Sequence, residues 1–299
     1  MNGIPSSTYF SAPPDWGWWI VFYFFFGGLA GGCYFLGALI DLFGRIEDRP
    51  LARLGYLISF PCILISGLLL TVDLHRPFRF WHMLIESNTF RPMFKPWSPM
   101  SLGSWALLIF GVFSLLAFLS ALADTGRLDW PPAKRFRPPG VLGGIFLVVG
   151  GVLGFYVAGY TGVLLAVTNR PIWSDTPLLG MLFVVSAASI SAALMILLAD
   201  KSRANMPGLL ALHRVDLWVL TLEFLVLIAV MISLGPVLRA WLSIWGLVLF
   251  LGVIVLGMWL PLALSWRHRN EVKMTTTAVL VLLGGFLLRL VVVFSAQGV

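Results

Sequence analysis

The chain of 299 residues is dominated by apolar side chains: 59% are hydrophobic, 11% are charged, and the mean hydropathy is +0.94. A soluble globular domain needs far less apolar surface, and a membrane β-barrel would show short alternating strands. The composition therefore excludes both classes and predicts an all-α integral membrane protein. The net charge of +7 comes mostly from loops, so it gives no reason to expect nucleic-acid binding.

Residues 1–15 predict a short N-terminal tail rather than a removable signal peptide. No basic residue precedes the first apolar stretch, and that stretch is too long for a signal. A membrane-spanning helix needs ~20 apolar residues, and we expect eight such segments in one domain covering 1–299. They are residues 16–43, 51–74, 99–123, 141–167, 177–199, 215–234, 241–264 and 275–296.

The basic residues predict the orientation of these segments. Most of them lie in the loops on the side opposite to the two termini. The positive-inside rule therefore places both termini outside, in the periplasm. The basic residues of these loops are Arg45, Arg49, Arg53, Arg127, Lys134, Arg135, Arg137, Lys201, Arg203, Arg214, Arg267, Arg269 and Lys273.

The loop between the second and third segments departs from that rule, because it is rich in cations although it lies on the terminal side. One interpretation is an interfacial segment whose cations reach the lipid headgroups, with Trp81 and Trp97 at headgroup depth. The other is a docking surface for another protein, with Asp73 and His75 at the membrane edge available for proton chemistry. The four residues predicted to dock the partner are Arg76, Arg79, Arg91 and Lys95.

The sequence lacks the ligand patterns that redox metals need. Its two cysteines, Cys33 and Cys62, are too few for an iron–sulfur cluster, which needs several closely spaced thiolates. The histidines lie near helix ends or in loops, whereas haem b in a membrane bundle needs them within helices. We therefore expect no haem, iron–sulfur cluster or other resident metal in this chain. The four histidines are His75, His82, His213 and His268.

Polar residues within apolar segments are costly and often functional. Tyr156 and Tyr160 lie one turn apart on one face of the fourth segment. Asp216 and Glu223 lie two turns apart on the sixth, and Arg289 lies in the eighth. The alternatives are a Glu223–Arg289 pair that only fixes helix packing, and tyrosines that are interfacial or core aromatics.

Four stretches, in order along the sequence, carry a resemblance to a known family. They are WGWWIVFYFFFGGLAGGCYFLGALIDL; DLHRPFRFWHML followed by SPMSLGSW; YTGVLLAVTNRPIWSDTPLL; and LLGGFLLRLVVVFSAQG. Together they resemble the NrfD/PsrC family, the quinone-interacting membrane subunits of polysulfide reductase and related complexes. Eight spans with both termini outside also agree with that family.

The resemblance implies a subunit that binds menaquinone or ubiquinone near the outer face of a bacterial or archaeal cytoplasmic membrane. Its partner would be a four-cluster ferredoxin-like iron–sulfur subunit, which passes electrons to or from a molybdopterin subunit. The terminal substrate chemistry would then lie on that partner. Tyr160 matches the family's head-group tyrosine, and the family's contacts at the start of the first helix fall on Asp15 and Trp16.

Quinone reduction consumes two electrons and two protons, so its site needs hydrogen-bond donors and groups that exchange protons. A tyrosine hydroxyl can donate to a quinone carbonyl, and a carboxylate and an imidazole at the membrane edge can exchange protons. We therefore predict a quinone site formed by Asp73, His75, Tyr156, Tyr160 and Trp16.

Asp216, Glu223 and Arg289 predict part of a proton route from the inner surface toward that site, which would make the complex electrogenic. Two other functions remain open. A secondary transporter would favour Gly/Pro-broken helices that meet at the midplane, and it would not copurify with an iron–sulfur protein. A redox-inert membrane anchor would keep electron transfer when Asp73, His75 or Tyr160 is replaced.

Overall fold

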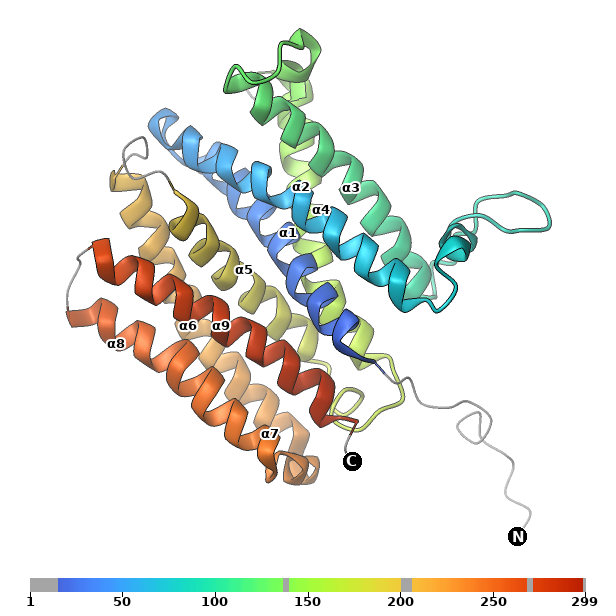
Figure 1. The fold of residues 1–299 in the computed structure, drawn as a ribbon, viewed down its shortest axis with the longest axis vertical. Helices are drawn as coiled ribbons and strands as arrows, with labels where there is room; N and C mark the ends of the chain where they lie inside the picture. Colours follow the sequence, from blue (N-terminus) through green and yellow to red (C-terminus); the bar gives the residue numbers. More distant parts are fainter. Residues whose placement is uncertain (1–15, 137–139, 200–205, 268–270, 298–299) are drawn as a thin grey trace.

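The computed structural model describes residues 16–136, 140–199, 206–267 and 271–297 (Figure 1). Within these ranges the secondary structure is helical apart from one isolated β-bridge, and eight helical spans are long and apolar enough to cross a membrane. A helix satisfies its own backbone N–H and C=O groups, which lipid cannot do, so long apolar sequences span a bilayer in this form. The residues discussed above that lie outside these ranges are the tail at 1–15 with Asp15, Arg137, Lys201, Arg203, His268 and Arg269.

The first four spans form one group, in which α1 and α3 each contact α2 and α4. A Cβ on Gly31 of α1 would collide with the carbonyl oxygen of Gly154 on α4. Glycine at this crossing lets the two helices approach closely. The spans are α1 (Trp18–Phe43), α2 (Arg49–Asp73), α3 (Pro99–Asp124) and α4 (Val141–Ala166).

The last four spans form a second group, which contacts the first mainly through α1 and α4 on one side and α5 and α9 on the other. The seventh span is wound as a π-helix over most of its length, between two short α-helical pieces. This group comprises α5 (Leu179–Leu198), α6 (Met206–Leu234), the seventh span with α7 (Ile244–Leu247), η6 (Val248–Trp259) and α8 (Leu260–Arg267), and α9 (Glu271–Ser295).

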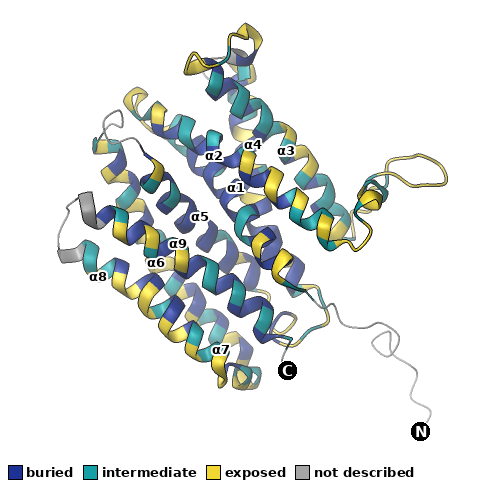
Figure 2. Ribbon diagram, viewed as in Figure 1, coloured by how far each residue is buried: buried dark blue, intermediate teal, exposed yellow. Residues whose placement is uncertain are grey.

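Helix α1 lies between the two groups and contacts α2, α4, α5 and α9. Figure 2 shows α1 buried along most of its length, whereas α3, α6 and the seventh span carry exposed apolar side chains on their outer faces. Apolar outer faces suit contact with lipid. Side chains on α1 can therefore reach both groups, which is how the polar residues described below are assembled.

The two ends of the bundle carry different connections (Figure 1). One end, which we call the terminal end, holds residues 16 and 297, the α2–α3 loop (residues 74–98), the α4–α5 linker (residues 167–178) and η5 (Gly235–Trp241). The other, the opposite end, holds η2 (Ile46–Asp48) and η4 (Pro131–Phe136). The first and last described residues thus share one end of the bundle, as an even number of spans requires.

Some predicted helix boundaries are wrong. The sixth helix begins at Met206 rather than at 215, because the polar residues His213 and Arg214 before the predicted start are helical as well. Within this helix the Asp216 carboxylate is buried and accepts a hydrogen bond from the Ser189 hydroxyl at 2.9 Å. Helix α9 begins at Glu271, but its candidate membrane span begins at Met274, one residue from the predicted start at 275. The predicted start of the seventh span at 241 falls at the end of the 3₁₀ turn η5, and α7 begins at Ile244.

The α2–α3 loop is an ordered projection from the terminal end (Figure 1). It begins with the 3₁₀ helix η3 (Pro77–Met83) and continues as a hairpin in which Met93 N–H donates to the Leu84 carbonyl at 2.8 Å. The indole N–H of Trp105 on α3 donates to the Met93 carbonyl at 2.9 Å. These bonds fix the hairpin to the start of α3, so the loop presents a defined surface.

Candidate functional site

Three tyrosines gather between α1, α3 and α4 in the half of the bundle nearer the terminal end. The rings of Tyr156 and Tyr160 are stacked, with centroids 5.9 Å apart and planes at 25°. Tyr23 of α1 is buried and lies near Tyr160. The phenol of Tyr160 packs so closely on Gly103 of α3 that a Cβ there would collide with it. The start of α3 therefore forms a wall of this tyrosine cluster.

The Tyr160 hydroxyl is suited to bind an acceptor that comes from another molecule. The side chain is 5% exposed, yet its hydroxyl makes no hydrogen bond to any residue that the structure describes. The hydroxyl oxygen is not among the fully buried atoms that lack a partner, so a ligand can reach it, and a donor in this position fits a carbonyl oxygen. The aromatic rings around it fit a flat ring system.

Asp73 and His75 lie together where α2 ends. The His75 Nδ1–H donates to the Asp73 carbonyl at 2.9 Å, and His75 is exposed with φ at +56°. This left-handed backbone is uncommon for residues other than glycine, and it turns the backbone from α2 into η3. Among the residues that the structure describes, no hydrogen bond or ring contact joins this pair to Tyr160. The two halves of the predicted site are thus adjacent to the same end of the bundle but not in contact.

Trp16 packs at the entrance to α1. Its ring stacks on Trp173 of the α4–α5 linker, with centroids 5.0 Å apart and planes at 25°. Its carbonyl accepts a hydrogen bond from the Gln297 side-chain amide at 2.6 Å. The structure shows these packing contacts for Trp16, and its contact with a quinone stays a prediction.

The predicted polar residues of the C-terminal half are brought together around Arg289. This side chain is fully buried, and it donates to the Phe24 carbonyl at 3.2 Å, the Gly285 carbonyl at 2.7 Å and the Ser186 hydroxyl at 3.1 Å. A buried arginine in an apolar span needs a carboxylate or carbonyl partner, and here two backbone carbonyls serve. Its second terminal nitrogen has no hydrogen-bond partner, and it lies 2.9 Å from where a Cβ on Gly28 would be.

Two serines of α5 connect Arg289 to the two acids of α6. Ser186 accepts from Arg289 and lies beside the buried Glu223 carboxyl. One turn further along α5, Ser189 donates to Asp216. Glu223 interacts electrostatically with both Arg289 and Asp216. A set of buried polar side chains on α9, α5 and α6, which we call the polar line, therefore lies within the apolar core.

In the described ranges, no group of three or more His, Cys, Asp or Glu side chains is placed to hold a metal ion. Cys33 and Cys62 are both buried and free.

Comparison with known proteins assigns the family. The family described as "Polysulphide reductase, NrfD" matches residues 9–299. The chain belongs to the NrfD family. It is 29% identical to the C subunit of polysulfide reductase from Wolinella succinogenes over 313 residues, covering 94% of each protein. It is 23% identical to Protein NrfD homolog of Haemophilus influenzae, covering 85% of this sequence and 84% of that protein.

Family membership and the eight apolar spans make this NrfD-family protein a multi-pass protein of the cytoplasmic membrane. Its predicted docking residues all lie on the α2–α3 loop at the terminal end. Arg76 and Arg79 lie on or next to η3, and Arg91 and Lys95 lie on or after the hairpin. All four side chains are exposed.

Four residues of this NrfD-family site were missed from the sequence. Tyr23 is one aromatic residue in a run of them, and Gly103 is a single glycine at a helix start, so neither gave a signal. Ser186 and Ser189 did give one, because serines three residues apart lie on one face of a helix. In an otherwise apolar segment that spacing indicates a polar stripe.

Proposed function

We propose that this NrfD-family protein is the quinone- or quinol-binding subunit of a multi-subunit respiratory oxidoreductase. It exchanges electrons between the membrane quinone pool and an iron–sulfur partner. The Tyr160 hydroxyl supports this proposal most directly, because it has no hydrogen bond to the described residues and lies on a largely buried side chain beside two further tyrosines. A menaquinone or ubiquinone carbonyl supplies the acceptor that such a donor needs.

In this proposal Tyr160 holds and orients the head group, and the rings of Tyr156 and Tyr23 exclude water from it. Trp16 closes the entrance of α1 on the same end. Asp73 and His75, at the end of α2, exchange protons between the aqueous edge and the site. The redox chemistry itself belongs to the bound quinone, and this protein supplies binding, orientation and protons.

The terminal end faces the periplasm in this proposal. The opposite end carries Arg45, Arg49 and Arg127 in or beside its connections, and most of the basic residues counted in the sequence fall in the loops of that end. The positive-inside rule assigns such an end to the cytoplasm. The quinone site and the docking loop would then lie on the outer side.

The partner proposed for the α2–α3 loop is a four-cluster ferredoxin-like subunit that passes electrons to or from a molybdopterin subunit. The Wolinella succinogenes relative is named as one lettered component of polysulfide reductase, which supports an assembly of several polypeptides. The exposed cations Arg76, Arg79, Arg91 and Lys95 would meet acidic side chains of the partner. Their loop is held in place by backbone hydrogen bonds, so little ordering is needed on binding.

Reversing the charges of Arg91 and Lys95 to glutamate is expected to release the iron–sulfur partner from purified membranes. Each like-charge contact disfavours docking, and the effect grows as the salt concentration falls. The measurement is the amount of partner that copurifies with the protein at low and moderate salt. Arg45→Glu is the matched control, because Arg45 is exposed at the opposite end. If the double variant keeps the partner in high salt, docking depends on other residues. If no iron–sulfur partner copurifies with the wild-type protein, the transporter function is favoured.

His75→Asn is expected to slow quinone-linked turnover about tenfold or more, because positioned acid–base groups contribute 10²–10⁴-fold. Asparagine tolerates the left-handed backbone that His75 adopts, so the exit from α2 is preserved while proton exchange is lost. The control is His75→Gly, which has the same tolerance and no side chain. If both variants turn over at the wild-type rate, His75 exchanges no proton and serves only the backbone turn after α2.

The polar line is proposed to carry protons between the cytoplasmic side and the quinone site, through Asp216, Glu223 and Arg289. Its serine bridges support this, because hydroxyls can pass protons between a buried carboxyl and its neighbours. A direct Glu223–Arg289 pair that only fixes packing is the alternative. The hydrogen bonds of Arg289 run to two carbonyls and to Ser186 rather than to the Glu223 carboxylate.

A further inference from the structure

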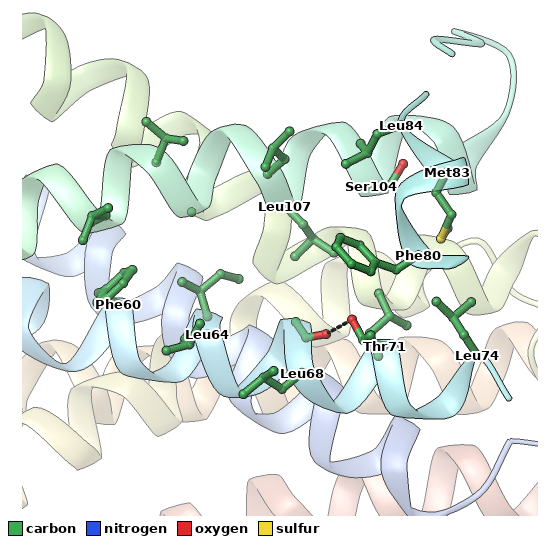
Figure 3. Close-up of a pocket in the computed structure, with 17 residues that line it drawn as sticks. Phe60, Leu64, Leu68, Thr71, Leu74, Phe80, Met83, Leu84, Ser104 and Leu107 are labelled. Atoms are coloured by element: carbon green, nitrogen blue, oxygen red, sulfur yellow. Dashed lines mark hydrogen bonds between the residues drawn. The ribbon is translucent and has the colours of Figure 1, made fainter. Parts of the chain in front are cut away.

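A groove that is separate from the tyrosine cluster lies between α2 and α3, beneath η3 (Figure 3). Its volume is about 540 Å³, within the range of small-molecule sites. In Figure 3 the ring of Phe80 projects from η3 between the two helices, close to Leu107 and Thr71. Gly103 of α3 faces Tyr160, whereas the next residue, Ser104, faces the groove. Helix α3 thus separates the two sites.

The groove has a hydrocarbon-like lining. Of the side chains that line it, only Thr71 and Ser104 carry a hydroxyl group. The Thr71 hydroxyl donates to the Gly67 carbonyl at 2.7 Å, and the Ser104 hydroxyl donates to the Ser101 carbonyl at 3.0 Å. Both donors are therefore used within their own helices. A quinone ring would find no free donor here, whereas a hydrocarbon chain needs none.

Glycines keep the groove open on both walls. Gly67 on α2 and Gly111 on α3 both line it, and a Cβ at either position would meet no atom within 4 Å. Close helix contact, the usual reason for glycine in a membrane span, therefore does not explain them. A Cβ at either position has open space around it, and a larger side chain there would occupy the groove.

The 3₁₀ helix over the groove is amphipathic. Residues three apart in such a helix lie on the same face. Phe80 and Met83 share the face that lines the groove, and Arg76, Arg79 and His82 form the neighbouring stripe. Both arginine side chains are exposed. A helix of this kind at the edge of a membrane-spanning bundle places positive charge where lipid headgroups lie, directly above an apolar groove.

We propose that the α2–α3 groove binds one acyl chain of an anionic phospholipid, whose phosphate lies against Arg76 and Arg79. The charge of the stripe selects the headgroup, and the lining selects the hydrocarbon. The site holds a structural lipid at the edge of the α2–α3 loop, so the lipid supports the surface on which a partner would dock. It does not depend on the tyrosine cluster, in which Tyr160 packs against a different face of α3 at Gly103. In this arrangement Arg76 and Arg79 bind the phosphate, and Arg91 and Lys95 remain for the partner.

The test uses the purified, delipidated membrane complex in detergent, with phosphatidylglycerol and phosphatidylcholine of identical acyl chains as probes. Native mass spectrometry counts the bound lipid and gives its dissociation constant. We expect one tightly held phosphatidylglycerol, with a preference of about 30-fold over phosphatidylcholine from the two arginines. Equal affinity for the two lipids would overturn the proposal.

Two variants separate the headgroup from the acyl chain. Gly67→Phe combined with Gly111→Phe should remove the tight site, whereas Gly144→Phe, at an equally open position on α4, should keep it. Arg76→Gln combined with Arg79→Gln should abolish the preference for phosphatidylglycerol but leave residual binding of both lipids. This second variant does not alter packing, so it tests the site even if the phenylalanine variant folds poorly. Unchanged preference in the arginine variant contradicts the proposal.

Other occupants give different results in the same experiment. If menaquinone with a long prenyl tail displaces phosphatidylglycerol one for one, and a short-tailed quinone does not, the groove holds a quinone tail instead. A bound mass equal to a polypeptide, lost in the phenylalanine variant, would identify a neighbouring helix as the occupant. Either result would overturn the proposal that a phospholipid occupies the groove.

Discussion

Replacing Tyr160 with phenylalanine is expected to weaken quinone binding about 10- to 100-fold while the complex still assembles. The variant removes one hydroxyl from a buried position, and an unsatisfied or lost buried hydrogen bond costs about 1–3 kcal/mol. The ring, its stacking on Tyr156 and its packing on Gly103 are kept. The measurement is the dissociation constant of a quinone analogue together with quinone-linked turnover of the purified complex.

Tyr34→Phe is the matched control for this variant. Tyr34 is as buried as Tyr160, but its hydroxyl already donates to the Phe146 carbonyl at 3.0 Å. Its loss should lower thermal stability slightly and leave quinone affinity unchanged. If Tyr160→Phe behaves like Tyr34→Phe, with unchanged quinone kinetics, Tyr160 does not belong to the quinone site.

Glu223→Gln is expected to reduce the membrane potential generated by quinone-linked turnover in reconstituted vesicles about tenfold or more. Glutamine keeps the size of the side chain and can still accept from Ser186, but it cannot carry a proton. If Glu223 has only a structural role, the variant should instead lose thermal stability, since breaking a buried pair by removing one partner destabilises a protein by about 3–5 kcal/mol. The decisive comparison is therefore between potential and thermal stability in one preparation.

Two serine variants of α5 complete the experiment: Ser186→Ala changes the polar line, and Ser191→Ala is the control. Ser186→Ala removes the hydroxyl that lies between Arg289 and Glu223 and accepts from Arg289, so it should also lower the potential. Ser191→Ala removes an equally buried hydroxyl that donates to the Leu29 carbonyl, away from the polar line, and should not. An intact, fully active Glu223→Gln complex that generates the wild-type potential would show that protons take another route.

The membrane spans could be predicted from the sequence because each depends on a local property, a run of apolar residues long enough to cross a bilayer. The stacked pair Tyr156 and Tyr160 is local in the same sense, since residues four apart on a helix are neighbours. The start of α6 was not predictable in this way, because the polar residues His213 and Arg214 precede the apolar run and are nevertheless helical. The hydrogen bond that Asp216 accepts comes from Ser189 of another helix, so local sequence does not indicate it either.

The partners of the buried polar residues could not be predicted from the sequence, because helix packing brings them together. The apolar spans predict that Arg289 needs carbonyl or carboxylate partners, but its bond to the Phe24 carbonyl joins residues 265 positions apart. Only the packing of α9 against α1 creates it. The groove under η3 likewise arises when the loop folds back over two helices, and no spacing within the loop indicates it.

The proximity of Tyr23 and Phe24 on α1 has a mechanical consequence. Tyr23 interacts with Tyr160 in the tyrosine cluster, and the carbonyl of the next residue, Phe24, accepts the hydrogen bond from Arg289 in the polar line. Of two adjacent residues on α1, Tyr23 therefore belongs to the tyrosine cluster and Phe24 to the polar line. A rigid helix transmits a small shift along its backbone without loss over so short a distance. Quinone binding at the tyrosine cluster and proton movement along the polar line would thus be coupled through α1.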